Sequence, residues 1–237
     1  MNLFTLLAVV VIVTIAYWIS FSVFKIKISS KLVQVAVPYS LVSGDDSKTL
    51  LVLGDSTAVG VGSTHPTDTV GAQLAQLVSA TYVENLAVSG AQVKDLSAQI
   101  KKASKDHYDF ILLQIGANDI LRLHSIEDVV SVLESDLLAL TQRGDHIIFI
   151  TAGNVGAAPI LPPPLRLFYT KTNLVYHEKF QALSEKHTIQ YVNLYQDPKD
   201  DPFVQNPKKY FAGDSFHPSS AGYGLWFEKI KSTIKLP

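Results

Sequence analysis

Residues 50–56 read Leu-Leu-Val-Leu-Gly-Asp-Ser, an apolar run that ends in a small polar turn. A short run that is apolar at every position is typical of a strand covered on both faces of a parallel sheet. Further apolar segments occur at 82–88, 110–113, 147–150 and 189–194. These five segments predict the strands of a parallel sheet.

Segments with helical periodicity lie between and after these strands, at 69–79, 93–104, 126–141, 170–187 and 219–234. Alternating strands and helices are typical of a parallel sheet covered by helices on both faces. Such sheets bind their ligands at the carboxyl ends of the strands. The loops that follow the strands are therefore where catalytic residues are expected.

Four loops carry residues suited to nucleophilic catalysis. They are Gly54-Asp55-Ser56 after the first strand, Gly90 after the second, Gly116-Ala117-Asn118-Asp119 after the third, and Asp214-Ser215-Phe216-His217 before the last helix. A serine hydroxyl needs a base to become a good nucleophile, and histidine suits that task near neutral pH. We predict that Ser56 is the nucleophile, that His217 is its base, and that Asp214 orients the imidazole.

Attack on an ester creates an oxyanion, which requires hydrogen-bond donors that are already in place. The backbone N–H groups of Ser56 and Gly90 and the side-chain amide of Asn118 are the predicted donors. Glycine at position 90 lets the backbone approach a ligand closely because it has no Cβ.

Together these motifs resemble those of the SGNH hydrolases, also called the GDSL family of esterases and lipases. The family pattern is Gly-Asp-Ser, a later Gly, Gly-x-Asn-Asp and a C-terminal Asp-x-x-His, and the resemblance covers about residues 49–234. Thr57 stands where the family usually has Leu, a departure that bears on substrate class more than on mechanism.

The resemblance implies a serine hydrolase that cleaves lipid, O-acetyl or small acyl esters through an acyl-enzyme and needs no cofactor. Acyl transfer to another alcohol is a close variant. The alternative is a catalytically silent domain that binds a lipid or glycan at the membrane. The expected fold is a flavodoxin-like three-layer α/β/α sandwich with a five-stranded parallel sheet, preceded by one transmembrane helix.

Other classes of site fit the sequence less well. The chain has no cysteine, so it has no disulfide framework and no thiol nucleophile. No Gly-Lys-Ser/Thr nucleotide motif and no His-Glu-x-x-His zinc motif occurs, so we predict neither a nucleotide nor a metal site. The formal net charge is -1, with no long blocks of one sign, and we expect no nucleic-acid partner.

The N-terminal segment 3–24 carries no charged residue. As a helix it would rise about 33 Å, close to the roughly 30 Å of a hydrocarbon core. No Lys or Arg precedes it, which favours a retained anchor over a cleaved signal peptide. The predicted division is an anchor at 1–24, a connector at 25–48 and a catalytic domain at 49–237.

Two signals conflict over the side of the membrane. Lys25, Lys27 and Lys31 follow the span, and the positive-inside rule would place the domain in the cytoplasm. Long domains can be translocated regardless of such charges, and members of the resembled family with such a segment often act outside. An extracytoplasmic, single-pass membrane protein is the expectation.

The connection 153–168 between the fourth strand and its helix is long and apolar. It is either a proline-rich strap over the core or one wall of an acyl pocket. On the second interpretation, Leu165 and Leu167 contact the substrate.

Overall fold

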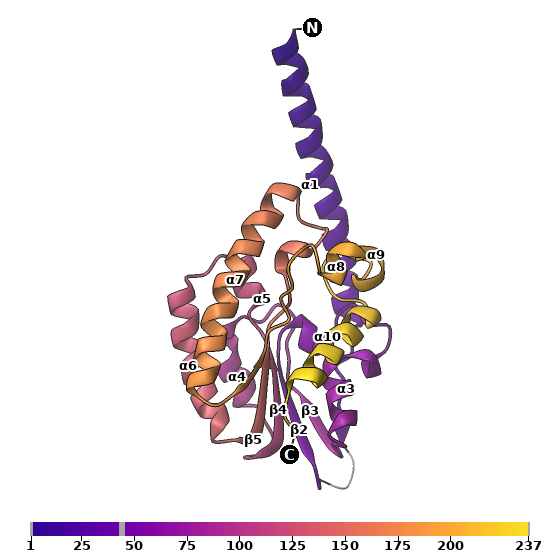
Figure 1. The fold of residues 1–237 in the computed structure, drawn as a ribbon. Helices are drawn as coiled ribbons and strands as arrows, with labels where there is room; N and C mark the ends of the chain where they lie inside the picture. Colours follow the sequence, from indigo (N-terminus) through magenta and orange to yellow (C-terminus); the bar gives the residue numbers. More distant parts are fainter. Residues whose placement is uncertain (1, 43–45, 237) are drawn as a thin grey trace.

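The computed structural model describes residues 2–42 and 46–236. One sheet has the strand order β1-β3-β2-β4-β5-β6 (Figure 1). Its parallel strands are β2 (Thr49–Gly54), β3 (Tyr82–Asn85), β4 (Tyr108–Gln114), β5 (Gly144–Ile150) and β6 (Gln190–Val192). All five predicted strands are therefore confirmed. The sequence did not reveal β1 (Leu41–Val42), a two-residue strand antiparallel to β3 at the edge of the sheet.

Helices cover both faces of this sheet, as predicted. The elements after the first helix are α2 (Ser56–Val59), η1 (Pro66–Asp68), α3 (Val70–Leu77), η2 (Val93–Asp95), α4 (Leu96–Ile100), α5 (Ala117–Leu121), α6 (Ile126–Thr141), η3 (Val155–Ala157), α7 (Pro163–Lys186), α8 (Pro202–Gln205), α9 (Pro207–Tyr210) and α10 (Ser220–Thr233). Side chains alternate along β2, so Leu51 and Leu53 face the core beneath α6 and α7. Leu50 and Val52 face the second core, beneath α3 and α10.

The N-terminal helix α1 (Leu3–Val35) is longer than the predicted anchor and continues through much of the predicted connector. Trp18, Phe21, Ser22 and Lys25 are half-buried, and pairs three and four residues apart among them place them on one side of the helix. The Ser22 hydroxyl donates to the Ile160 carbonyl (3.2 Å), and Lys25 Nζ donates to the carbonyl of Gly213 (2.8 Å). The helix is long and apolar enough to cross a membrane, a property that signal sequences share.

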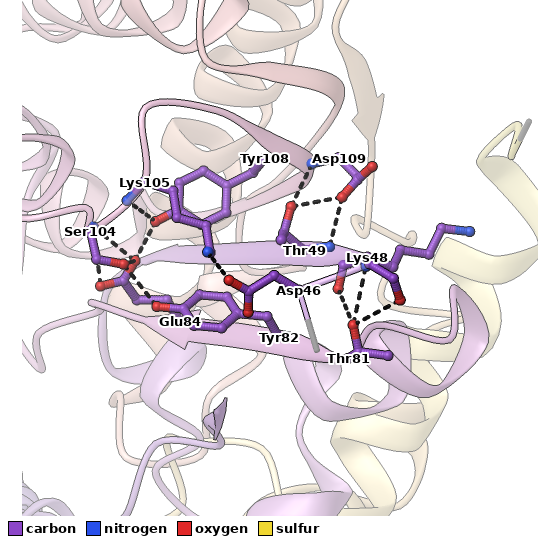
Figure 2. Close-up of polar contacts among 11 residues, drawn as sticks. Asp46, Lys48, Thr49, Thr81, Tyr82, Glu84, Ser104, Lys105, Tyr108 and Asp109 are labelled. Carbon is purple, nitrogen blue, oxygen red and sulfur yellow. Dashed lines mark hydrogen bonds and ion pairs between the residues drawn. The ribbon is translucent and has the colours of Figure 1, made fainter. Parts of the chain in front are cut away.

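Polar contacts fasten the amino ends of the strands (Figure 2). The backbone N–H and hydroxyl of Thr49 on β2 both donate to Asp109 Oδ2 on β4, each at 2.7 Å. Lys105 pairs with Asp46 at 2.5 Å and lies over the ring of Tyr82. These contacts fix β2, β3 and β4 relative to one another at the edge opposite the catalytic loops.

Candidate active site

Ser56 lies at a sharp turn where β2 passes into α2. Gly54 has φ +140°, and a Cβ there would lie 1.9 Å from the Gln114 carbonyl oxygen, so only glycine fits. Asp55 caps the helix because its carboxylate accepts from the backbone N–H of Thr57 at 2.8 Å. Ser56 is therefore the first residue of α2, where backbone N–H groups have no partner within the helix.

His217 is placed against Ser56 by a turn that begins at Asp214. Ser215 adopts a left-handed conformation (φ 61°), which folds this turn back on itself. Asp214 Oδ1 accepts from the backbone N–H groups of Phe216 and His217, both at 3.0 Å. Its Oδ2 lies 2.6 Å from His217 Nδ1, and His217 Nε2 lies 2.9 Å from Ser56 Oγ. Asp214, His217 and Ser56 form one continuous chain of hydrogen bonds, in the order predicted for an orienting carboxylate, a base and a nucleophile.

The electrostatics of Asp214 favour the tautomer that catalysis requires. Burial by itself would raise the pKa of this fully buried carboxyl. The hydrogen bond and charge of His217, with two backbone N–H groups, outweigh burial and lower its pKa below the usual range. Asp214 is thus a carboxylate that holds the proton on Nδ1, so Nε2 is free to accept the proton of Ser56.

Asn118 lies in the same pocket as Ser56 and His217. Its side-chain Nδ2 donates to the Ala91 carbonyl at 2.9 Å, a contact that orients the amide. An amide nitrogen carries two hydrogens, so the second remains for a bound oxyanion.

Gly90 immediately precedes Ala91, whose carbonyl accepts the hydrogen bond from Asn118. It has φ +84°, which favours glycine, and it is exposed. Gly90 is not among the described residues that line the pocket. The structure thus brings together Ser56, Asp214, His217 and Asn118 and leaves Gly90 at an exposed turn beside them.

A mostly apolar pocket adjoins Ser56. Its walls come from the loops after β5 and β6 and from the C-terminal helices, and include Val155, Ala158, Leu194, Phe203, Phe211 and Trp226. Val155 and Ala158 belong to the 153–168 connection, for which a pocket wall was one of the two predicted roles. The sequence prediction missed the other walls because they come from separate segments, each unremarkable by itself.

Leu165 and Leu167 lie elsewhere, contrary to the prediction that they contact the substrate. Both belong to α7, with 44% and 63% of their surface exposed, and neither lines the pocket. Proline is tolerated in the first turn of a helix, so α7 begins at Pro163, ahead of the predicted start at 170. Only the first part of the 153–168 connection, around Val155 and Ala158, reaches the pocket.

Thr57, the departure from the family pattern, supports Asp55. The Thr57 hydroxyl and backbone N–H both donate to Asp55 Oδ1 at 2.8 Å. Burial raises the pKa of Asp55 to about 6, although these two hydrogen bonds oppose the shift. Through these hydrogen bonds Asp55 stabilises the turn at Ser56. Among residues 2–42 and 46–236, no group of three or more His, Cys, Asp or Glu side chains could hold a metal ion.

Comparisons with known proteins agree with this geometry. A curated GDSL-like esterase of Mycobacterium tuberculosis is 26% identical over 185 residues, which are 74% of this chain and 58% of that longer protein. An acetyl-xylooligosaccharide esterase variant from Geobacillus stearothermophilus superposes with a TM-score of 0.59 at 20% identity, covering 81% of this chain and 96% of that one. Phospholipase A1 of Streptomyces albidoflavus gives 0.58 at 16% identity, covering 79% and 99%. At such identities the solved structures establish a shared fold.

The family model for GDSL-like lipases and acylhydrolases matches residues 52–225. This range includes the turn that holds Ser56, the loop that holds Asn118 and the Asp214–His217 pair. The chain therefore belongs to the GDSL-like lipase/acylhydrolase family.

Proposed function

We propose that the protein is a serine esterase that hydrolyses carboxylic esters through an acyl-enzyme intermediate. The observation that carries this proposal is the hydrogen-bonded chain from Asp214 through His217 to Ser56, with distances of 2.6 and 2.9 Å, beside an apolar pocket. A surface serine has no need of a buried histidine and carboxylate aligned in this order.

Acylation begins when Ser56 Oγ attacks the ester carbonyl carbon and its proton moves to His217 Nε2. The carbonyl oxygen becomes an oxyanion, which accepts hydrogen bonds from the Ser56 N–H, the second Asn118 Nδ2 hydrogen and, as predicted from the sequence, the Gly90 N–H. The tetrahedral intermediate collapses, its C–O bond to the alcohol breaks, and the alcohol leaves with the proton from Nε2.

Deacylation repeats these steps with water. His217 Nε2 removes a proton from the water, whose oxygen attacks the acyl carbon. The bond to Ser56 Oγ breaks, the proton returns to the serine, and the free acid leaves. Every step uses groups of this protein, the ester and water, so the proposal requires no cofactor and no metal.

The apolar pocket supports an acyl chain as the group held beside Ser56. Phe203, Phe211 and Trp226 offer it large apolar surfaces against which a hydrocarbon chain can pack. The same residues would also support acyl transfer if an alcohol replaced the water. A silent lipid- or glycan-binding domain would have no chemical need for the aligned Ser56 and His217.

A fluorophosphonate probe tests the proposed nucleophile because it reacts with activated serines. We expect mass spectrometry to locate the adduct on Ser56 and Ser56→Ala to abolish both labelling and hydrolysis of p-nitrophenyl esters. Esters of graded chain length then define the acyl preference. An unlabelled protein, or full turnover by a folded Ser56→Ala variant, would refute the mechanism.

We also propose that α1 anchors the protein in a membrane with the catalytic domain on the extracytoplasmic side. The uncharged segment 3–24 supports the anchor, and the length of the domain supports translocation. Protease added to intact cells or spheroplasts should digest the domain. Digestion only after permeabilisation would place it in the cytoplasm, as Lys25, Lys27 and Lys31 suggest.

A further inference from the structure

The catalytic domain contacts α1 within the uncharged segment 3–24 that is proposed to cross the bilayer. The Ser22 hydroxyl of this segment bonds to the domain, whereas residues 3–17 are exposed. At 1.5 Å per residue, residues 3–21 rise about 28 Å, close to the roughly 30 Å of a hydrocarbon core. If segment 3–24 spans the membrane, Ser22 lies at the end of the span, together with the part of the domain that it touches.

The part of the domain at this level is the turn formed by residues 159–168, which we call the apical turn. The carbonyl of Ile160 in this turn accepts from the Ser22 hydroxyl at 3.2 Å. Figure 1 shows the amino end of α7, in orange, at the end of the domain from which α1 projects.

The outer surface of the apical turn is apolar. Leu165, Leu167 and Phe168 have 44%, 63% and 47% of their surface exposed, and Pro163 and Pro164 beside them are also exposed. Apolar side chains gathered in one short segment of surface mark an interaction site more often than single exposed ones do.

The one charged residue of the apical turn, Arg166, folds inward. Its Nε donates to the Leu161 carbonyl at 2.8 Å and its Nη2 to the Pro159 carbonyl at 3.0 Å. Backbone carbonyls in hydrocarbon require an internal partner because no water is present. Arg166 supplies such a partner to two backbone carbonyls. Its charge then does not face outward, so the outer surface of the apical turn is suited to contact with lipid.

The apical turn also borders the catalytic pocket. Ala158, which lines the pocket, directly precedes it. The backbone N–H of Ile160 donates to the Ser215 carbonyl at 3.1 Å, and the next two residues, Phe216 and His217, line the pocket. The turn 214–217, which holds His217, is thus hydrogen-bonded to the apical turn.

We infer that the apical turn inserts into the same bilayer that α1 spans, and that the enzyme draws its ester substrate from that bilayer. This inference rests on the proposed esterase activity and on the proposed anchor. A long-chain ester then reaches Ser56 from the lipid phase through the side of the pocket beside Ala158 and Phe216.

Depth measurements on the full chain in phosphatidylcholine vesicles test the insertion independently of activity. The chain has no cysteine, so single substitutions accept one nitroxide label each. Leu165→Cys and Leu174→Cys form a matched pair, because both leucines lie on α7 with 44% and 43% exposure. They are separated by about 14 Å along the helix. Ile12→Cys in α1 provides the reference for a label in lipid.

We expect oxygen to collide with the label at 165 more often than a water-soluble nickel chelate does, as at position 12. At position 174 the nickel chelate should collide more often. Equal ratios of oxygen collisions to nickel collisions at positions 165 and 174 would overturn the insertion. Low collision rates for both reagents at 165 would indicate contact with a second copy of the chain and would also overturn it. Nickel-dominated collisions at position 12 would remove the anchor and the inference with it.

Two esters with the same leaving group test the source of the substrate. The vesicle-bound enzyme should hydrolyse 4-methylumbelliferyl oleate placed in its own vesicles and lose most of that rate when the oleate resides in separate vesicles. Water-soluble 4-methylumbelliferyl acetate should be hydrolysed in both arrangements. If the acetate is hydrolysed and the oleate is hydrolysed equally fast in both arrangements, uptake of the substrate from the bilayer is overturned. The esterase proposal then remains intact. Hydrolysis of neither ester would refute the esterase proposal itself.

Discussion

Asp214→Asn should inactivate the enzyme without unfolding it, because the geometry fixes the orientation of the new amide. Asp214 Oδ1 accepts two backbone N–H groups at 3.0 Å, so the asparagine must keep its oxygen there. Turning the amide over would sacrifice both buried hydrogen bonds, at about 1–3 kcal/mol each. Its nitrogen must therefore face His217 Nδ1, which lies 2.6 Å from the present Oδ2.

An amide N–H at that place donates to Nδ1 and leaves the proton of the neutral imidazole on Nε2. His217 then points a donor at Ser56 Oγ, 2.9 Å away, and cannot accept its proton. We expect kcat for p-nitrophenyl acetate to fall by about 10⁴-fold, or roughly 5.5 kcal/mol of transition-state stabilisation. Steady-state hydrolysis measures this loss, and the rate of fluorophosphonate labelling should fall with it.

Asp136→Asn is the matched control. Asp136 is also a buried aspartate, but it lies on α6 and does not line the pocket. This variant should keep its turnover, and thermal unfolding by circular dichroism should show both variants folded. A loss smaller than about tenfold in a folded Asp214→Asn variant would refute the assigned role of Asp214.

Three further changes test other parts of the site. Asn118→Ala should lower kcat on the order of 10²- to 10³-fold with little change in KM, because one oxyanion donor is removed; an unchanged kcat would exclude this amide from the oxyanion hole. Burial raises the pKa of Asp55 from 3.8 to about 6, so its ionised form opposes folding above that pH and has no such effect below pH 3.8. Urea unfolding gives the free energy of unfolding of Asp55→Asn relative to that of the native chain. This difference should be up to about 3 kcal/mol more favourable to the variant at pH 8 than at pH 3.5, and an equal difference at both pH values would refute the shift. Leu225→Trp should narrow the apolar pocket and reduce kcat/KM for octanoyl more than for acetyl esters, whereas equal losses would place the acyl chain elsewhere.

The sequence predicts the elements whose residues carry a local signal. The parallel strands β2, β4 and β5 are apolar on both faces, and their carboxyl ends carry the motifs that predict Ser56 and Asn118. The pairing of Ser56 with His217 also follows from the sequence, because both motifs lie at the same edge of such a sheet.

The features that the sequence did not reveal depend on tertiary contacts. Helix α1 continues to Val35, and within it Lys25 and Ile28 lie against the loop at Gly213, a tertiary contact that the local sequence does not indicate. Strand β1 has two residues and exists only by pairing with β3. The start of α7 at Pro163 was missed because prolines and apolar residues also suit an extended strap.

The catalytic hydrogen bond between Ser56 and His217 joins residues 161 positions apart in the chain. Because synthesis proceeds from the amino end, Ser56 is made well before His217. Until His217 is made, the nascent chain therefore carries a serine with no base to activate it. Fragments that end before position 214, through a premature stop codon or proteolysis, lack Asp214 and His217 and should be inactive. Activation of Ser56 becomes possible only after the Asp214–His217 turn has been made and has folded against the nucleophile turn.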